Sequence, residues 1–189
     1  MLKRLVRNIV RVVFVVLAFP LAALCGFGRW VYLYGIGTHL VALGPGILGD
    51  YLRSGYYCLT LRSCPFHCRI SFGAVFSNPD AMVSERVYIG PYSVMGRVRI
   101  GEGTQIATHV QILSGANQHK RDAAGKIQGS EHGEFLPVTI GSHSWIGAGA
   151  IVMASVGNNT IIGAGAVVTK EIPDGVVAVG NPARILDRS

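Results

Sequence analysis

Residues 87–113 read VYIGPYSVMGRVRIGEGTQIATHVQIL, and in this stretch an aliphatic residue followed by Gly or another small residue returns about every six positions. A period of six fits neither an α-helix nor a simple amphipathic strand. A fixed short spacing is typical of a solenoid, in which one unit stacks on copies of itself. A β-sandwich alternates with a period of two, so the stretch predicts a solenoid instead.

Two sets of residues in this repeat are expected to point inward from the flat faces of a coil. They are the aliphatic residues Val94, Ile100, Ile106 and Ile112, and the small or β-branched residues Val98, Thr104, Val110 and Ala116. We expect Gly to follow the aliphatic residue because a corner needs a residue that tolerates a tight turn. Ile89-Gly90 fits the unit one step out of phase, which predicts an irregular corner in the first coil. The step from Val152 to Ile162 is ten residues instead of twelve, which predicts one shortened coil.

The same unit returns near the C-terminus, where residues 138–186 read VTIGSHSWIGAGAIVMASVGNNTIIGAGAVVTKEIPDGVVAVGNPARIL. These blocks resemble the maltose, galactoside, nodulation-factor and xenobiotic O-acetyltransferases. Residues 89–110 are similar to the UDP-N-acetylglucosamine acyltransferase of lipid A synthesis. The chain thus resembles the hexapeptide-repeat acyltransferases. The resemblance implies an all-β fold, a left-handed parallel β-helix of triangular section, which assembles as a homotrimer and uses acetyl-CoA as acyl donor with no metal.

The net charge of +7 is concentrated near the N-terminus, where the first 62 residues hold seven basic side chains and one acid. This asymmetry argues against nucleic acid as a partner and favours an anionic membrane surface. Residues 12–28 carry no charge or His, and a second apolar stretch covers residues 30–49. Two short helices in a hairpin, or one helix that enters and leaves the same leaflet, both fit this pattern. Either places the following domain at the cytoplasmic face of a bacterial inner membrane.

We expect three parts in the chain. Residues 1–49 form an N-terminal helical membrane anchor, residues 50–68 a juxtamembrane linker along the membrane surface, and residues 69–189 the β-helix acetyltransferase domain. The rhythm of the repeat stops at Asn117 and resumes near Val138, so residues 117–137 form a long excursion that we expect to be the catalytic loop.

The resemblance implies that His119, in this excursion, is the catalytic base, although Gln118 stands where the xenobiotic branch has His directly after Asn. A sugar hydroxyl is a poor nucleophile until its proton is removed, and an imidazole exchanges protons near neutral pH. His132 is the competing candidate. The acids within reach by sequence are Asp122, Glu131 and Glu134, and the sequence leaves the choice among them open.

The resemblance also implies a set of donor-binding residues along the C-terminal coils. They are Ala148, Ala166, Thr169, Lys170 and Arg184. Coenzyme A carries phosphates, and Lys170 and Arg184 supply the cations that phosphates require.

Together these features favour a membrane-associated O-acetyltransferase that moves acetyl from acetyl-CoA to a hydroxyl of a cell-surface glycan or lipid-linked sugar. An N-acetyltransferase acting on an amino sugar is one alternative. A metal-binding hexapeptide protein without acyltransferase activity is the other.

Overall fold

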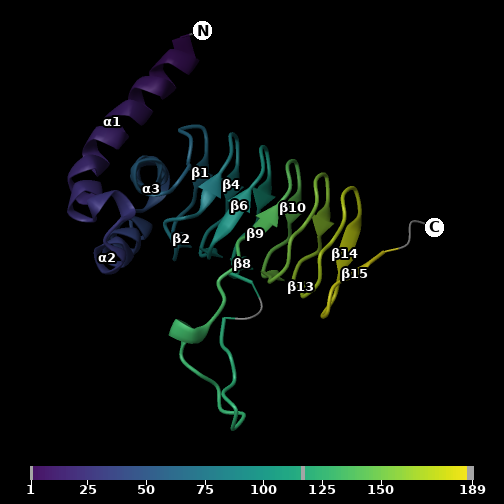
Figure 1. Cartoon of the computed structure of the whole chain (residues 1–189). Helices are drawn as coiled ribbons and strands as arrows, with labels where there is room; N and C mark the ends of the chain where they lie inside the picture. The colour runs from purple at the N-terminus through teal and green to yellow at the C-terminus, as the bar shows by residue number, and fades with distance from the viewer. Residues whose placement is uncertain (1, 116–117, 187–189) are drawn as a thin grey trace.

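The computed structural model describes residues 2–115 and 118–186, in which a helical N-terminal part leads into a stack of β-coils (Figure 1). Each coil contributes short strands to three sheets, here named the seven-, five- and three-stranded faces. The chain passes through the faces in that order, so the stack has three edges. The first edge leads from the seven- to the five-stranded face, the second from the five- to the three-stranded face, and the third returns to the seven-stranded face.

The strands of each face pair in parallel, except for the antiparallel pair β14–β15 that closes the C-terminal end. The seven-stranded face contains β1 (Arg69–Ile70), β4 (Tyr88–Ile89), β7 (Gln105–Ile106), β10 (Trp145–Ile146), β12 (Ile161–Ile162), β14 (Val177–Val179) and β15 (Arg184–Ile185). The five-stranded face contains β2 (Val75–Phe76), β5 (Val94–Met95), β8 (Gln111–Ile112), β11 (Ile151–Val152) and β13 (Val167–Val168). The three-stranded face contains β3 (Met82–Val83), β6 (Val98–Ile100) and β9 (Val138–Ile140), and single bridges at Val156 and Ile172 continue it.

One aliphatic residue per strand fills the axis of the stack. The inward positions predicted for Ile100, Ile106 and Ile112 are confirmed, because all three are buried. The prediction for Val94 is wrong: its side chain is 38% exposed, and Met95 points inward with no exposed area. Met95 and Ile100, the two inward residues, are five positions apart and not six. Counting back six positions from Ile100 therefore reaches Val94, the outward neighbour of Met95. The expected irregular corner thus lies between Met95 and Ile100. Ala116, for which an inward position was also predicted, lies outside the described residues.

The tight turns at the first and third edges lie further along the chain than we expected. Left-handed backbone occurs three residues after the inward aliphatic residue, as at Gly149 (φ 70°) and Gly165 (φ 67°). The glycine directly after the aliphatic residue has another role. A side chain at Gly90 would overlap the backbone of Ala107 in the next coil. That glycine is therefore required by the close approach of two coils and not by the turn itself.

The second edge absorbs the differences in length between coils. The chain crosses it with residues 77–81, 96–97, 113–137, 153–155 and 169–171 in successive coils. Ile146 pairs with Ile162 and Ile162 with Ala178, so the last two complete coils have 16 residues each. The shortened coil predicted near Val152 is confirmed, and a second coil of the same length follows it.

Three helices and a short 3-10 turn cover the N-terminal end of the stack. They are α1 (Leu2–Leu24), η1 (Gly26–Gly28), α2 (Val31–Ala42) and α3 (Gly46–Thr60). Figure 1 shows α3 between α1 and β1. Leu5–Leu24 is a stretch of 20 residues with a mean hydropathy of 2.0, which is enough by length and composition to cross a membrane. The 12 residues of α2 are too few to cross a bilayer, so α1 is the one helix of the described residues that is long enough to span it.

The helices supply hydrogen-bond partners to the first coil, whose outer side has no preceding coil to pair with. Tyr34 Oη donates to the Phe76 carbonyl at 3.0 Å, and the Phe76 N–H donates to Tyr57 Oη at 3.2 Å. Residues 50–60, which we expected in a linker along the membrane surface, instead form most of α3 and are largely buried. The open end of a parallel stack exposes unpaired backbone groups, and α2 and α3 cover it.

Arg53 of α3 is the most deeply buried charge of this cap, with no exposed area. Its Nε donates to the Ile70 carbonyl of β1 at 2.9 Å, and Nη1 donates to the Gly44 carbonyl at 2.7 Å. Its Nη2 lies 2.6 Å from Asp50 Oδ1, and Asp50 also pairs with Arg69 at 2.8 Å. Burial lowers the pKa of the Arg53 guanidinium, and its hydrogen bond to the Asp50 carboxylate opposes that shift.

We predict that Arg53→Met lowers the free energy of unfolding by about 3 kcal/mol, because it leaves Asp50 and several carbonyls of the cap without a buried donor. Urea unfolding of the full chain in detergent measures this change. The control Arg86→Met removes an exposed pair with Glu102 and should cost less than about 1 kcal/mol. Equal midpoints for the two variants would contradict the role assigned to Arg53.

Candidate active site

The excursion in the repeat leaves the stack at the second edge, between β8 and β9, and projects away from it (Figure 1). Arg97 holds both ends of the excursion. Its backbone N–H donates to Ser114 Oγ at 2.8 Å, and its Nη1 donates to the Phe135 carbonyl at 3.2 Å. Its Nη2 also lies 3.2 Å from Asp80 Oδ2 in the first coil. Three successive coils are thus joined along this edge through one side chain. Asn117, the first residue of the predicted catalytic loop, lies outside the described residues.

The outer part of the excursion is a small hairpin. The Gln128 N–H donates to the Lys120 carbonyl at 2.8 Å, and the Asp122 N–H donates to the Lys126 carbonyl at 2.9 Å. Asp122 Oδ1 accepts hydrogen bonds from the backbone N–H groups of Ala124 and Lys126, each at 2.9 Å. The carboxylate of Asp122 therefore closes the turn at the tip, as Asp side chains commonly do.

His119 lies at the base of this hairpin with an exposed side chain. Its Nδ1 is 3.1 Å from the carbonyl oxygen of Gln128. A carbonyl only accepts hydrogen bonds, so Nδ1 carries the proton and the neutral ring has its lone pair on Nε2. The backbone of the opposite hairpin strand thus orients the exposed imidazole, and Nε2, which makes no hydrogen bond within the described residues, is left as a proton acceptor.

The other acids and histidines of the excursion lie apart from this pair. Glu131 Oε1 is 3.8 Å from His132 Nε2, so these two side chains pair with each other. In residues 118–186 and 2–115, no hydrogen bond joins a carboxylate to His119. His109 stacks on Tyr92, with ring centroids 5.1 Å apart, at a corner of the first edge where its φ is 57°. That arrangement gives His109 a role in the corner.

The residues expected to bind the donor lie on more than one edge. Thr169 and Lys170 are exposed at the second edge, two coils beyond the excursion. Ala148 lies at the first edge, on the other side of the five-stranded face. Arg184 is exposed on β15, at the C-terminal end of the stack. The five-stranded face separates Ala148 from the edge that carries His119 and Lys170.

Ala166 has no exposed area and faces the axis of the stack. The residue at the level of Ala148 in the next coil is Ala164, since the Gly165 N–H donates to the Ala148 carbonyl at 2.8 Å. Ala164 is exposed. In both GAGA segments, residues 147–150 and 163–166, the first alanine (Ala148 or Ala164) therefore lies at the surface. The second alanine (Ala150 or Ala166) fills the core.

Sequence reasoning missed the Gln128 carbonyl, Arg97 and Ala164. A backbone carbonyl has no residue signature, so the partner of His119 could not be found among side chains. Arg97 lies directly after Gly96 at a corner of the repeat, which was a usable indication of a contact there. Ala164 could have been found by counting the 16-residue coil from Ala148.

A triangular stack of parallel coils with a histidine-bearing excursion defines the hexapeptide class of transferases. The family described as "Bacterial transferase hexapeptide (six repeats)" matches residues 137–170. Nodulation protein L of Rhizobium leguminosarum bv. viciae is 40% identical over 154 residues, which cover 79% of this chain and 70% of that protein. Nodulation protein L of Rhizobium meliloti (strain 1021) is 41% identical over 128 residues, covering 64% of this chain and 63% of that protein. The chain therefore matches about two thirds of the length of these curated relatives.

Solved structures agree with these relatives. A maltose O-acetyltransferase from Clostridium difficile 630 superposes with a TM-score of 0.68 at 26% identity, and the match covers 88% of each chain. AntD, an N-acyltransferase from Bacillus cereus in complex with dTDP and 3-hydroxybutyryl-CoA, shares the fold with a TM-score of 0.55 at 16% identity, over 67% of this chain and 82% of that chain. The chain belongs to the hexapeptide-repeat acetyltransferase family, whose repeat implies a left-handed β-helix.

We predict that Arg97→Gln loosens the excursion while the stack stays folded. The side chain bonds of Arg97 are partly exposed, so the unfolding midpoint should move by less than about 1 kcal/mol. Limited proteolysis should cut residues 118–136 several-fold faster than in the wild type, because one anchor of the excursion is lost. The control Arg99→Gln changes an exposed residue of β6. Similar cleavage of both variants would contradict the anchoring role.

Proposed function

We propose that the chain is an acetyl-CoA-dependent O-acetyltransferase that acts on a hydroxyl of a cell-surface glycan or lipid-linked sugar. The observation that carries this proposal is the imidazole of His119, whose Nδ1 is occupied by the Gln128 carbonyl at 3.1 Å. The outward Nε2 can then accept a proton from a hydroxyl placed against it. Family membership gives the reaction class within which this base acts.

The proposed step needs no covalent enzyme intermediate. His119 Nε2 takes the hydroxyl proton as the hydroxyl oxygen forms a bond to the acetyl carbonyl carbon. The carbon–sulfur bond of the thioester breaks, and the imidazolium returns the proton to the leaving sulfur. The Gln128 carbonyl accepts from Nδ1–H throughout, so it keeps the ring oriented and stabilises the imidazolium once Nε2 is protonated.

Donor binding is proposed for the exposed residues of the C-terminal coils. Lys170 and Arg184 offer cations to the phosphates of coenzyme A. Ala148 and Ala164 keep the first edge free of bulky side chains, so that a long narrow donor can lie against the backbone. Thr169 adds a hydroxyl beside Lys170. Ala166 contributes only to the core beneath this surface.

The acceptor class is proposed from the relatives and from the N-terminal helices. One structural neighbour is a maltose O-acetyltransferase, and the relatives by sequence include Nodulation protein L. Most of the large apolar side chains that are exposed in the described residues lie between Leu5 and Leu48. We propose that this surface anchors residues 1–49 in the cytoplasmic leaflet of a bacterial inner membrane, with the β-helix on the cytoplasmic side.

A homotrimer is proposed because one subunit does not bring the whole site together. His119 and Lys170 lie on the second edge, and Ala148 and Ala164 on the first. The second edge of one subunit placed against the first edge of the next would join base and donor in one groove. Three subunits close such a ring around a common axis.

We predict that His119→Ala lowers acetyl transfer by about 10²–10⁴-fold, the usual contribution of a positioned base. Mass spectrometry of surface glycans from cells that carry the variant should show the loss of an acetyl group. His132→Ala is the matched control on the same excursion, and it should retain the acetylated glycan. The reverse result would move the base to His132. Retention of acetyl groups in both variants would reject the proposed mechanism.

We predict that Lys170→Ala raises the KM for acetyl-CoA about tenfold and leaves kcat within about twofold, because a phosphate contact is made in the ground state and the transition state alike. Steady-state release of coenzyme A measures both constants. Arg86→Ala removes an exposed cation at the third edge and serves as control. An unchanged KM in the Lys170 variant would remove this residue from the donor site.

A further inference from the structure

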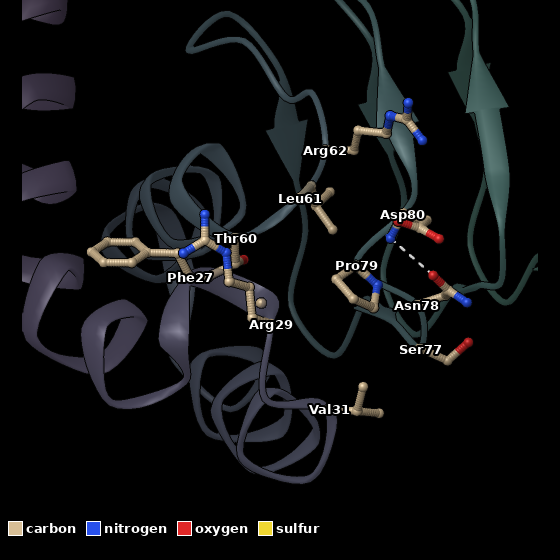
Figure 2. A pocket seen from close by; sticks show the side chains of 11 residues that line it. Phe27, Arg29, Val31, Thr60, Leu61, Arg62, Ser77, Asn78, Pro79 and Asp80 are labelled. Carbon is tan, nitrogen blue, oxygen red and sulfur yellow. Dashed lines mark hydrogen bonds between the residues drawn. The ribbon is translucent and has the colours of Figure 1, made fainter.

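A hollow of about 550 Å³ lies between the helical cap and the first coil. Figure 2 shows its lining, which comes from the connection between η1 and α2, from the end of α3, and from the second-edge corner of the first coil. The polar members of the lining are Arg29, Thr60, Arg62, Ser77, Asn78 and Asp80. The hollow is thus a polar site at a junction between the apolar helices and the repeat.

The connection that forms one wall is built by close packing. Gly28 is buried with a φ of 87°, and a side chain there would overlap the Thr60 carbonyl oxygen. This contact presses the chain before Arg29 against the end of α3. On the opposite wall, Asn78 Oδ1 accepts from the Asp80 N–H at 2.8 Å and shapes the corner. Both walls are therefore fixed by glycine packing and by a turn.

The hollow has an excess of positive charge. Asp80, its one acid, pairs with Arg97 at 3.2 Å. Within the described part of the chain, neither Arg29 nor Arg62 takes part in an ion pair. Figure 2 shows Arg29 beside Phe27 and Arg62 beside Leu61, on different sides of the hollow. Guanidinium groups are the side chains best suited to bind phosphate oxygens.

The rim on the helical side is apolar. Phe27 is 42% exposed and Val31 is 62% exposed, and both line the hollow. Arg29 lies between them in the sequence, as a cation between two apolar stretches of the proposed membrane anchor. A cation beside exposed apolar side chains fits the boundary between lipid headgroups and acyl chains.

The hollow lies on the same edge as the candidate base. Its corner belongs to the first coil, Arg97 to the second and the excursion to the third, and Arg97 bonds to both Asp80 and the Phe135 carbonyl. Coils stack at the strand spacing of about 4.8 Å, so the hollow and the root of the excursion are about 10 Å apart along the stack. One or two sugar units can bridge the distance from the hollow to the root of the excursion.

We propose that this hollow binds the phosphate that links a sugar acceptor to its lipid, with Arg29 and Arg62 as the phosphate ligands and Phe27 and Val31 against the first part of the lipid chain. This inference rests on the proposed function and deepens it, because it selects the phosphate-linked lipid among the possible acceptors. The lipid remains in the membrane, and the sugar extends along the second edge toward His119.

The test is a binding measurement on the full chain in neutral detergent micelles, without any acyl donor. Native mass spectrometry is used to titrate a long-chain polyprenyl phosphate, the same polyprenol without phosphate, phosphatidylglycerol and inorganic phosphate. We expect the polyprenyl phosphate to bind once per chain, and at least about tenfold more tightly than each of the other three. Because no transfer is measured, this result stands or falls separately from the acetyltransferase activity.

The variants assign the binding to the hollow. The double variant R29Q/R62Q should lose the preference for the phosphate, R29K/R62K should retain most of it, and the control R86Q should behave as the wild type. Both arginines are exposed, so unchanged melting temperatures are expected for all variants. Equal binding of polyprenol overturns the phosphate assignment, and equal binding of phosphatidylglycerol or inorganic phosphate overturns the lipid-linked acceptor. An R29Q/R62Q variant that keeps the preference removes the hollow from acceptor binding.

Discussion

The parallel register between coils is the constraint on which the rest of this structure depends. The strands have only two or three residues, and inside the stack each is held by the coil before it and the coil after it. The register therefore leaves no freedom at the first and third edges, where the left-handed residue always has the same position. Insertions are tolerated only at the second edge. The excursion enters there between Ile112 and Ile140, and both residues keep their pairing with the previous coil.

The same constraint makes the first coil incomplete, because its strands have a neighbour on one side only. The cap helices meet this demand with Tyr34, Arg53 and Tyr57, whose polar groups bond to β1 and β2. The apolar residues of the N-terminal helices thus lie on two different surfaces, one packed against the stack and one exposed. The inner faces of α2 and α3 complete the core of the stack, and the outer faces stay apolar. Hydropathy and the basic charge assigned residues 1–49 to a membrane anchor, since hydropathy does not distinguish residues buried in protein from residues that face lipid.

The fold could be predicted from the sequence where the repeat is regular, and the site only in part. The inward positions of Ile100, Ile106 and Ile112 were predicted correctly from the period of six. The inward position predicted for Val94 was wrong, because the corner between Met95 and Ile100 is one residue shorter. Ala166 was assigned to the donor site by its motif, but a motif does not tell inward from outward positions, and its burial leaves that surface to Ala164. The Gln128 carbonyl and the partners of Arg53 were beyond reach, because contacts to backbone depend on geometry and not on residue type.

The insertion-tolerant edge also explains how the proposed chemistry is distributed. The proposed binding groups follow one another along the second edge, from the first coil to the fifth. In that order they are the hollow with Arg29 and Arg62, the anchoring Arg97, the excursion with His119, and Lys170. Residues at this edge can vary without disturbing a ladder, so the fold leaves it free for binding groups. The small residues Ala148 and Ala164 lie on the first edge, where the register keeps every corner short. A flat face separates the two edges within one subunit, and in the proposed homotrimer contact between subunits would bring the variable edge of one chain to the smooth edge of another.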